Sequence, residues 1–118
     1  MAPPDPRAII LAEHEAYNRQ DLDRLMSYYA TDAVILDGNG TVMHQGSDAV
    51  RSAMVQVFER MPDVHVDWPE IFQVGEWVAV HDIVPNWKFA DAPGQREMQW
   101  VALYRVVNGK IKQLQLFS

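Results

Sequence analysis

The stretch from Asn18 to Asp37 decides the fold, and it reads Asn-Arg-Gln-Asp-Leu-Asp-Arg-Leu-Met-Ser-Tyr-Tyr-Ala-Thr-Asp-Ala-Val-Ile-Leu-Asp. Asp21 is a typical N-cap for a short helix. The apolar stripe of that helix is predicted to be Leu22, Leu25, Met26 and Tyr29. The branched run 33–37 then predicts a strand that ends in an acid. Asp37 is a candidate general acid or base, because partial burial at the rim of an apolar layer tunes a carboxylate for proton transfer.

A longer helix is predicted before this stretch. Asp5 followed by Pro6 is typical of a helix start, because proline lacks the N–H that the first helical position leaves unpaired. Ile10, His14 and Tyr17 then recur at helical spacing. The sequence therefore predicts a helix that carries these three side chains on one stripe.

A tight turn and a third helix are predicted to follow. Gly38-Asn39-Gly40 favours a hairpin turn, with 41–44 as the returning strand. Ser47 and Asp48 are typical helix caps, and Pro62 ends the helix. Its buried stripe is predicted to be Val50, Met54, Val57, Phe58 and Met61.

After Pro62 the chain favours extended structure. Gly75, Ala92-Pro93-Gly94 and Asn108-Gly109 separate four segments and predict hairpins in an antiparallel meander. The segments cover residues 64–74, 76–89, 95–107 and 110–117. Pro69 and Pro85 within them indicate bulges or edge positions. Helices first and strands afterwards predict an α+β fold, with helices on one face of a curved, mainly antiparallel sheet in one domain over 1–118.

Composition narrows the class of protein. The chain has 118 residues and no cysteine, which excludes disulfides and thiolate chemistry. A net charge of −6 argues against nucleic-acid or membrane partners. No apolar run reaches the ~20 residues that cross a bilayer, and the N-terminus does not resemble a secretory signal. We expect a cytoplasmic protein.

Four motifs resemble the nuclear transport factor 2-like superfamily over nearly the whole chain. They are Asn18-x-x-Asp21-Leu22-Asp23, Tyr29-Ala30-x-Asp32-Ala33, Gly46 before the third helix, and Asn108-Gly109-Lys110-Ile111. The superfamily includes ketosteroid isomerases, SnoaL-type polyketide cyclases and limonene-epoxide hydrolases. The resemblance implies a cone-shaped α+β barrel in which three N-terminal helices pack on the sheet.

The ketosteroid isomerase branch is the nearest functional comparison. The resemblance places Asp37 at the position of that branch's proton-shuttling aspartate. Its oxyanion-hole residues are not matched, because Glu13 and approximately Ala102 stand at those positions. Tyr17 and His81 are the remaining candidate donors to an oxyanion. The implied catalytic residues are therefore Asp37, Tyr17 and His81.

The family's strand register implies which side chains face the cavity. It points His81, Ile83, Pro85 and Trp87 inward and Asp82 outward. The ligand-binding residues implied in this way are His14, Met54, Phe58, Ile83, Trp87, Trp100, Tyr104, Leu114 and Leu116. Such an aromatic chamber with few polar groups suits a small hydrophobic molecule carrying a carbonyl or hydroxyl.

The outward face of the sheet is predicted to pair with a second copy. The register places Val78, Val80 and Val84 there, with Val101 and Leu103. Apolar side chains on a face that no helix covers favour a homodimer.

Other interpretations of these residues stay open. Asp37 has an alternative role as acceptor for the amides of its turn, and the alternative for His81 is an ordinary core histidine. The four histidines show no spacing typical of zinc, so no metal or other cofactor is expected. Epoxide hydrolysis by an Asp-Arg-Asp set of side chains on adjacent strands, with Arg96 or Arg105 as the arginine, is disfavoured because strand alternation points Arg105 outward.

Two classes of function remain: an enzyme catalysing isomerisation or aldol-type cyclisation, and a non-catalytic ligand-binding or protein-interaction domain.

Overall fold

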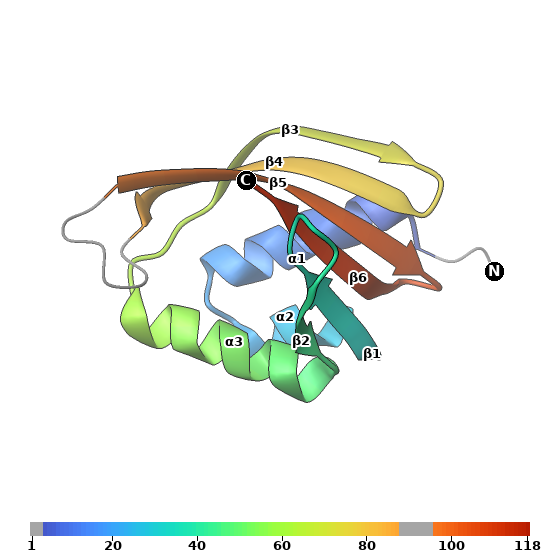
Figure 1. The fold of residues 1–118 in the computed structure, drawn as a ribbon, viewed down its shortest axis with the longest axis horizontal. Helices are drawn as coiled ribbons and strands as arrows, with labels where there is room; N and C mark the ends of the chain where they lie inside the picture. The colour runs from blue at the N-terminus through green and yellow to red at the C-terminus, as the bar shows by residue number, and fades with distance from the viewer. Residues whose placement is uncertain (1–3, 88–95) are drawn as a thin grey trace.

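Helices cover one face of a curved sheet in the computed structural model, which describes residues 4–87 and 96–118 (Figure 1). The elements are α1 (Pro6–Asn18), α2 (Leu22–Ser27), β1 (Tyr29–Leu36), β2 (Val42–Gln45), α3 (Ser47–Arg60), β3 (Asp67–Val74), β4 (Trp77–Trp87), β5 (Arg96–Val107) and β6 (Lys110–Phe117). The predicted α+β order is confirmed. The predicted break at 92–94, the start of the segment at residue 95, and the end of the preceding segment at 88–89 lie outside the described residues.

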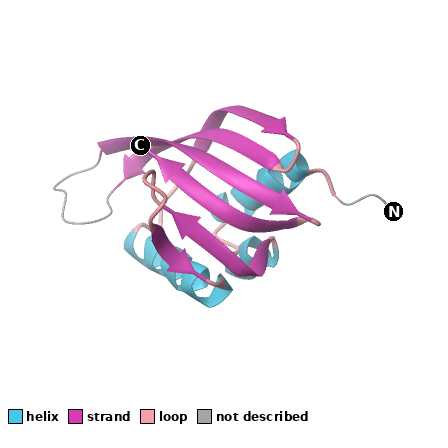
Figure 2. Ribbon diagram, turned by 45° about the vertical axis from the view of Figure 1, so that its right-hand side comes forward, coloured by secondary structure: helices cyan, strands magenta, loops and turns pink. Residues whose placement is uncertain are grey.

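The six strands form one sheet in the order β2-β1-β6-β5-β4-β3 (Figure 2). Strands β3 to β6 pair antiparallel with their neighbours, which confirms the predicted meander. Strand β1 lies parallel to β6, and Ile35 is opposite Leu114. This pairing joins the first third of the chain to its last strand, so the helices on either side of β1 come to lie under the meander.

The boundaries of α2 and α3 agree with the prediction only in part. Asp21 caps α2, because its Oδ1 accepts a hydrogen bond from the Arg24 amide at 3.3 Å. Tyr29 belongs to β1 rather than to the stripe of α2, since it pairs with Ile111 in the sheet. The N-cap of α3 is Gly46 with φ at +88°, a backbone conformation that glycine adopts without strain.

Both strand prolines lie at irregularities, as predicted. Pro69 lies in β3, an edge strand whose register shifts between Asp67 and Glu70. Pro85 lies in β4, where the register shifts between Val84 and Trp87. Two residues of β4, Pro85 and Asn86, lie opposite one residue of β5 there, so the bulge returns Trp87 to the inner face of the sheet.

The core lies between the inner face of the sheet and the helices. Its largest fully buried side chains are Ile10, Leu25, Val50, Val78, Val80, Val84 and Ile111. The prediction that the three valines of β4 face outward is therefore wrong. Apolar side chains at alternate positions favour the face that the helices cover, because burial removes the most apolar area from water there.

The outer face of the sheet carries a different set of apolar side chains. Val101 and Leu103 lie on it, as predicted, opposite Phe117 and Gln115 of β6. The exposed large apolar side chains on this face are Phe72, Val74, Trp77, Val101 and Phe117. None of the described helices is both long and apolar enough to pass through a membrane.

Candidate active site

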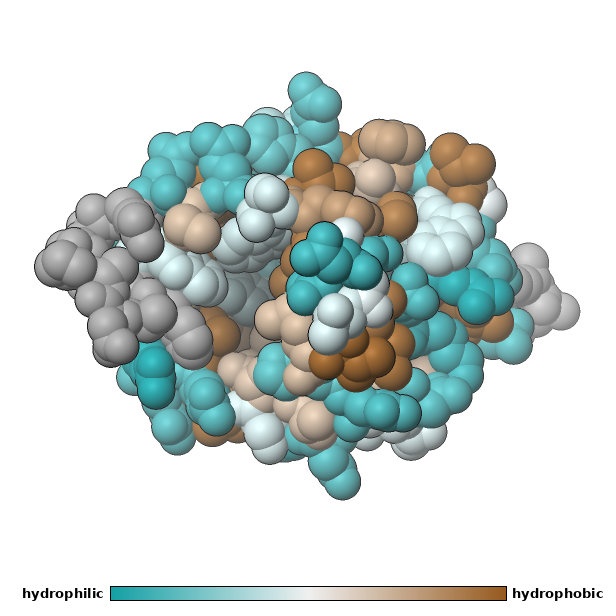
Figure 3. All heavy atoms as spheres, viewed as in Figure 1, coloured by the Kyte–Doolittle hydropathy of each residue, from teal (hydrophilic) through white to brown (hydrophobic). Residues whose placement is uncertain are grey.

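A cavity of about 840 Å³ opens between the inner face of the sheet, α1 and α3. The molecular surface is hollowed on the face drawn in Figure 3. The apolar lining of the cavity comes from four elements: Met54 and Val57 of α3, Trp87 of β4, Met98 and Trp100 of β5, and Leu114 and Leu116 of β6. A volume in this range holds a small organic ligand.

Helix α1 supplies the polar end of the cavity. Glu13, His14 and Tyr17 all line it, because they lie within one turn on the side of α1 that faces the sheet. Glu13 and His14 are buried although both are ionisable. Buried ionisable groups are costly unless they are paired, so their partners decide what this region can do.

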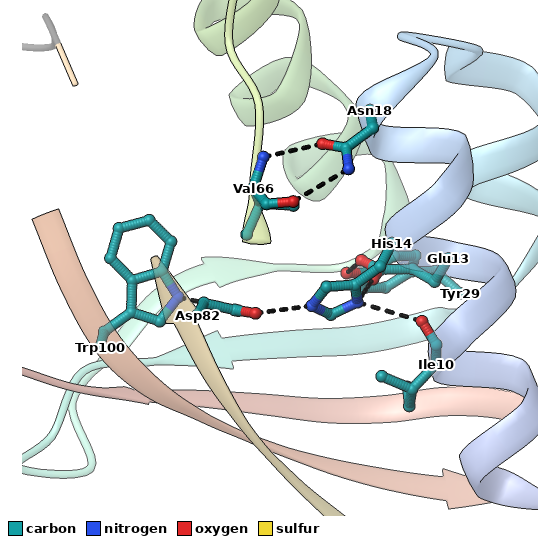
Figure 4. Close-up of polar contacts among 8 residues, drawn as sticks. All are labelled: Ile10, Glu13, His14, Asn18, Tyr29, Val66, Asp82 and Trp100. Carbon is teal, nitrogen blue, oxygen red and sulfur yellow. Dashed lines mark hydrogen bonds and ion pairs between the residues drawn. The ribbon is translucent and has the colours of Figure 1, made fainter. Parts of the chain in front are cut away.

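The partners form a hydrogen-bonded chain from Tyr29 to Trp100, which we call the floor of the cavity. Figure 4 shows its part from His14 through Asp82 to Trp100. The Tyr29 hydroxyl donates to Glu13 Oε2 at 2.8 Å. Glu13 Oε1 lies 2.7 Å from His14 Nδ1, which also faces the Ile10 carbonyl oxygen at 3.0 Å. His14 Nε2 lies 2.8 Å from Asp82 Oδ1, and Trp100 Nε1 donates to Asp82 Oδ2 at 3.1 Å. Helix α1 and strands β1, β4 and β5 thus meet at one network.

The imidazole of His14 is held in its charged form. Burial lowers the pKa of His14, but the charge of Glu13, the hydrogen bonds to Asp82 and Glu13, and the charge of Asp82 outweigh burial and raise it to about 10. The geometry agrees, because both ring nitrogens face oxygen acceptors and each needs its own proton to donate. His14 is an imidazolium at neutral pH.

Three tyrosines surround this charged chain and stay protonated. Burial raises the pKa of Tyr17, Tyr29 and Tyr104 well above its usual value, and the charges of Glu13 and Asp82 raise it further. All three line the cavity. Their hydroxyls are therefore neutral hydrogen-bond donors over the physiological pH range.

Asn18 holds one wall of the cavity against α1. Its Nδ2 donates to the Val66 carbonyl at 2.9 Å, and its Oδ1 accepts from the Val66 amide at 2.8 Å (Figure 4). Val66 lines the cavity in the segment that connects α3 to β3. The same helix therefore positions both the ionisable groups and the backbone opposite them.

Asp37 lies at the mouth of the cavity rather than on its floor. Its Oδ1 accepts hydrogen bonds from the amides of Asn39 and Thr41, each at 2.9 Å. The side chain is half-buried and lines the opening together with Gly38 and His44. The alternative role considered for Asp37, stabilising its own turn, is present. Its catalytic role stays a prediction.

The predicted inward register of β4 is wrong. His81 and Ile83 lie on the outer face, where His81 Nε2 lies 2.8 Å from Gln99 Oε1. Pro85 is exposed, and Asp82 points into the cavity instead of away from it. The register that the family resemblance implied for β4 was shifted by one residue. A shift of one residue moves every side chain of a strand to the opposite face of the sheet.

Sequence reasoning missed Asp82 and the pairing of Glu13. A signal was present, because Val78, Val80 and Val84 share a parity, and Asp82 is the one charged residue among them. An acid inserted into an apolar stripe indicates a buried, partnered carboxylate. Phe58 also differs from its prediction: it packs on the Tyr17 ring, with centroids 5.3 Å apart, and is not among the lining residues.

The other predicted ligand-binding residues all line the cavity. They are His14, Met54, Trp87, Trp100, Tyr104, Leu114 and Leu116. Their contact with a ligand stays a prediction. Across residues 4–87 and 96–118, no three His, Cys, Asp or Glu side chains are arranged to hold a metal ion.

Comparison with known families and structures agrees with this architecture. The model of the SnoaL-like domain matches residues 11–114. The chain belongs to the SnoaL-like domain family. The fold is that of the nuclear transport factor 2-like superfamily, as the sequence motifs predicted. No curated protein matches the chain.

Three solved structures illustrate what this SnoaL-like protein is similar to. An uncharacterised cystatin-fold protein from Novosphingobium aromaticivorans is 26% identical, with 98% of this chain and 99% of that one covered and a TM-score of 0.88. IdmH, a putative polyketide cyclase from Streptomyces antibioticus, is 25% identical, with coverages of 97% and 91% and a TM-score of 0.77. A ketosteroid isomerase-like protein from Catenulispora acidiphila, solved with trimethylamine, is 18% identical, with coverages of 99% and 87% and a TM-score of 0.77, and shows the fold alone.

Proposed function

We propose that this SnoaL-like protein is a cofactor-independent enzyme that moves a proton on a hydrophobic carbonyl compound, in an isomerisation or an aldol-type cyclisation. One observation carries the proposal. Asp82 is only 3% exposed, yet it lines the cavity and is bonded to His14 and Trp100. A buried carboxylate beside an imidazolium, open to an apolar chamber, is an arrangement typical of proton transfer.

The roles follow from the protonation states. Since His14 is already protonated at neutral pH, it cannot be the base, and Asp82 takes that role. Asp82 accepts the proton from the carbon next to the carbonyl and returns it to the product. Both oxygens of Asp82 already take part in hydrogen bonds, with His14 and Trp100, so the reaction suits a substrate proton that is already acidic, such as one flanked by two carbonyl groups.

The negative charge that develops on the carbonyl oxygen needs a donor. Tyr17 and Tyr104 line the same cavity, and their hydroxyls remain protonated. They replace the pair of donors that the sequence lacks at Glu13 and Ala102. Loss of one such donor typically costs about 3 kcal/mol of transition-state stabilisation.

Proton exchange on model ketones tests the proposal without knowledge of the natural substrate. We expect the protein to accelerate deuterium incorporation at the carbon between the carbonyls of a hydrophobic 1,3-diketone, read by NMR. The Asp82→Asn variant should lose roughly 10²–10⁴-fold of this rate. Asp37→Asn should retain it, and circular dichroism should show that both variants fold. Equal rates for wild type and Asp82→Asn would refute the role of Asp82.

The second class, a non-catalytic binding domain, predicts a different result. Such a domain would bind the diketone without accelerating exchange, and the Asp82→Asn variant would change affinity alone. Calorimetric titration alongside the exchange assay separates the two classes. The cavity itself is compatible with both, so the charged floor is the feature that favours the enzyme.

We also propose that two copies pair through the outer faces of their sheets. Phe72 and Val74 are 63% and 68% exposed there, and Val101 lies on the same face. Light scattering coupled to size exclusion should give twice the 13.5 kDa chain mass at micromolar concentration. Val101→Glu should shift the protein to a monomer, because it places a charge in an apolar interface. A wild-type monomer would refute the dimer.

A further inference from the structure

The ionisable groups that face the cavity carry an excess of negative charge. On the floor, Glu13 and Asp82 flank one imidazolium, His14, so these three groups sum to −1. At the mouth Asp37 adds a further carboxylate to the cavity lining, which also includes His44. The floor groups are buried, so water and salt screen them little.

No lysine or arginine lines the cavity among the side chains that the structure describes. Several basic side chains are instead paired on the exterior of the protein. Arg51 bonds Asp23 at 2.6 Å, Arg105 bonds Glu76 at 3.2 Å, and Lys112 bonds Asp32 at 2.9 Å. An anionic ligand would therefore enter without a counter-ion from these groups.

The walls of the cavity favour positive charge as well. The Trp87 and Trp100 rings meet edge to face, with centroids 5.5 Å apart, and both line the cavity. The Tyr104 ring lies 5.9 Å from His14 and is only 4% exposed. Tyr104 lines the cavity. Aromatic faces attract a cation, most strongly where water is excluded.

We propose that the cavity selects its ligand by charge, in the order hydrophobic ammonium compound, neutral compound, anion. A carboxylate would pay for desolvation and would face a net negative floor, whereas an ammonium group gains from both the floor and the aromatic walls. For the substrate, this inference rests on the proposed function. It means that the reacting carbonyl is a ketone, ester or amide rather than a free acid, and that an amine substituent strengthens binding.

Three adamantane probes that differ in one substituent test the charge order directly. They are 1-(aminomethyl)adamantane, 1-(hydroxymethyl)adamantane and adamantane-1-carboxylate, titrated into the wild-type protein at pH 7 and followed by tryptophan fluorescence and calorimetry. The ammonium probe should bind at least about tenfold more tightly than the carboxylate, because a charge within several ångströms of the floor changes affinity by this much or more. The alcohol should lie between them.

A matched pair of variants locates the source of the selectivity. Glu13→Gln removes one floor charge but keeps an oxygen for the Tyr29 hydroxyl, whereas Glu15→Gln makes the same change on the exposed side of α1. The ammonium-to-alcohol affinity ratio should fall about fivefold in Glu13→Gln and stay unchanged in Glu15→Gln. Asp37→Asn, in the exposed turn, should lower the ammonium-to-alcohol affinity ratio by less than Glu13→Gln does. If Glu13→Gln does not fold, Asp37→Asn provides the cavity variant for the comparison.

Binding of the carboxylate as tightly as the ammonium probe would overturn the inference. So would the absence of measurable ammonium binding, or equal ratios for wild type and every cavity variant. The probes undergo no reaction, so this outcome is independent of the exchange assay. A charge-selective cavity without proton exchange would refute the enzyme alone, and exchange without charge selection would refute the inference alone.

Discussion

Asp82 and Asp37 show how two carboxylates of one cavity differ in chemistry. Asp82 lies on the floor, buried in the middle of β4, and its partners are the side chains of His14 and Trp100. Asp37 lies at the mouth, half-exposed after β1, and its Oδ1 is occupied by two amides of its own turn. The partners of Asp37 belong to its own turn, whereas both oxygens of Asp82 are bonded to side chains of the cavity floor. The proposal that Asp82 is the base depends on this difference in burial and partners.

The largest expected effect is on the floor. Asp82→Ala leaves two buried donors, His14 Nε2 and Trp100 Nε1, without an acceptor, so the free energy of unfolding should fall by roughly 3–5 kcal/mol. Urea denaturation at pH 7 measures it. The matched control is His81→Ala, the adjacent residue on the outer face, for which we expect a change within about 0.5 kcal/mol. Similar losses in the two variants would contradict the difference between the faces.

The pH dependence of stability tests the charge on the floor. Below pH 6.5 both the folded and the unfolded state bind the His14 proton, so its contribution is fully present. Between pH 6.5 and about 10 only the folded state binds it, and the free energy of unfolding should fall with rising pH by up to about 1.4 kcal/mol per unit.

Denaturation curves of two histidine variants assign this slope. His14→Gln should remove the decline between pH 6.5 and 10, whereas His65→Gln, at an exposed ion pair with Asp67, should preserve it. NMR titration of the His14 ring in the wild type should show a protonated imidazole up to about pH 10. A neutral ring at pH 7 would contradict the imidazolium assignment.

A smaller effect is expected at the far end of the hydrogen-bonded chain. Tyr29→Phe removes the hydroxyl that donates to Glu13 Oε2, so a buried carboxylate loses one donor. The free energy of unfolding should fall by about 2 kcal/mol, the usual value for a hydrogen bond to a charged group. Tyr28→Phe, at the half-buried neighbouring position, is the control. If both variants unfold at the same urea concentration, the Tyr29 hydroxyl contributes nothing.

The smallest effect is expected at the mouth. Asp37→Asn keeps an oxygen that accepts the amides of Asn39 and Thr41, so the urea midpoint should change little, by less than about 0.5 kcal/mol in free energy. Deuterium exchange on the diketone should proceed at the wild-type rate. A large loss of exchange with unchanged stability would instead make Asp37 the base, as the family position implies, and would reverse the comparison between floor and mouth.

Much of the fold was predictable because it depends on local signals. The cap at Asp21 and the prolines at bulges act within a few residues, and both signals are confirmed by the structure. The parallel pairing of β1 with β6 was not found, since no short-range signal connects Ile35 to Leu114. The same reason explains the predicted cavity lining: His14 and Tyr17 of α1 line the cavity as predicted, whereas the face of β4 was inverted.

The sequence by itself determined an α+β member of the nuclear transport factor 2-like superfamily, an aromatic chamber, and Tyr17 and His14 on its wall. Periodicity, helix caps and turn residues are signals between residues close in the sequence, so they can be recognised without the structure. Only the tertiary structure decided that Asp82 meets His14, because those residues are 68 positions apart and a one-residue register choice separates a buried acid from an exposed one. That register depends on packing of the whole sheet against the helices, which makes the acid of the cavity floor a property of the folded molecule.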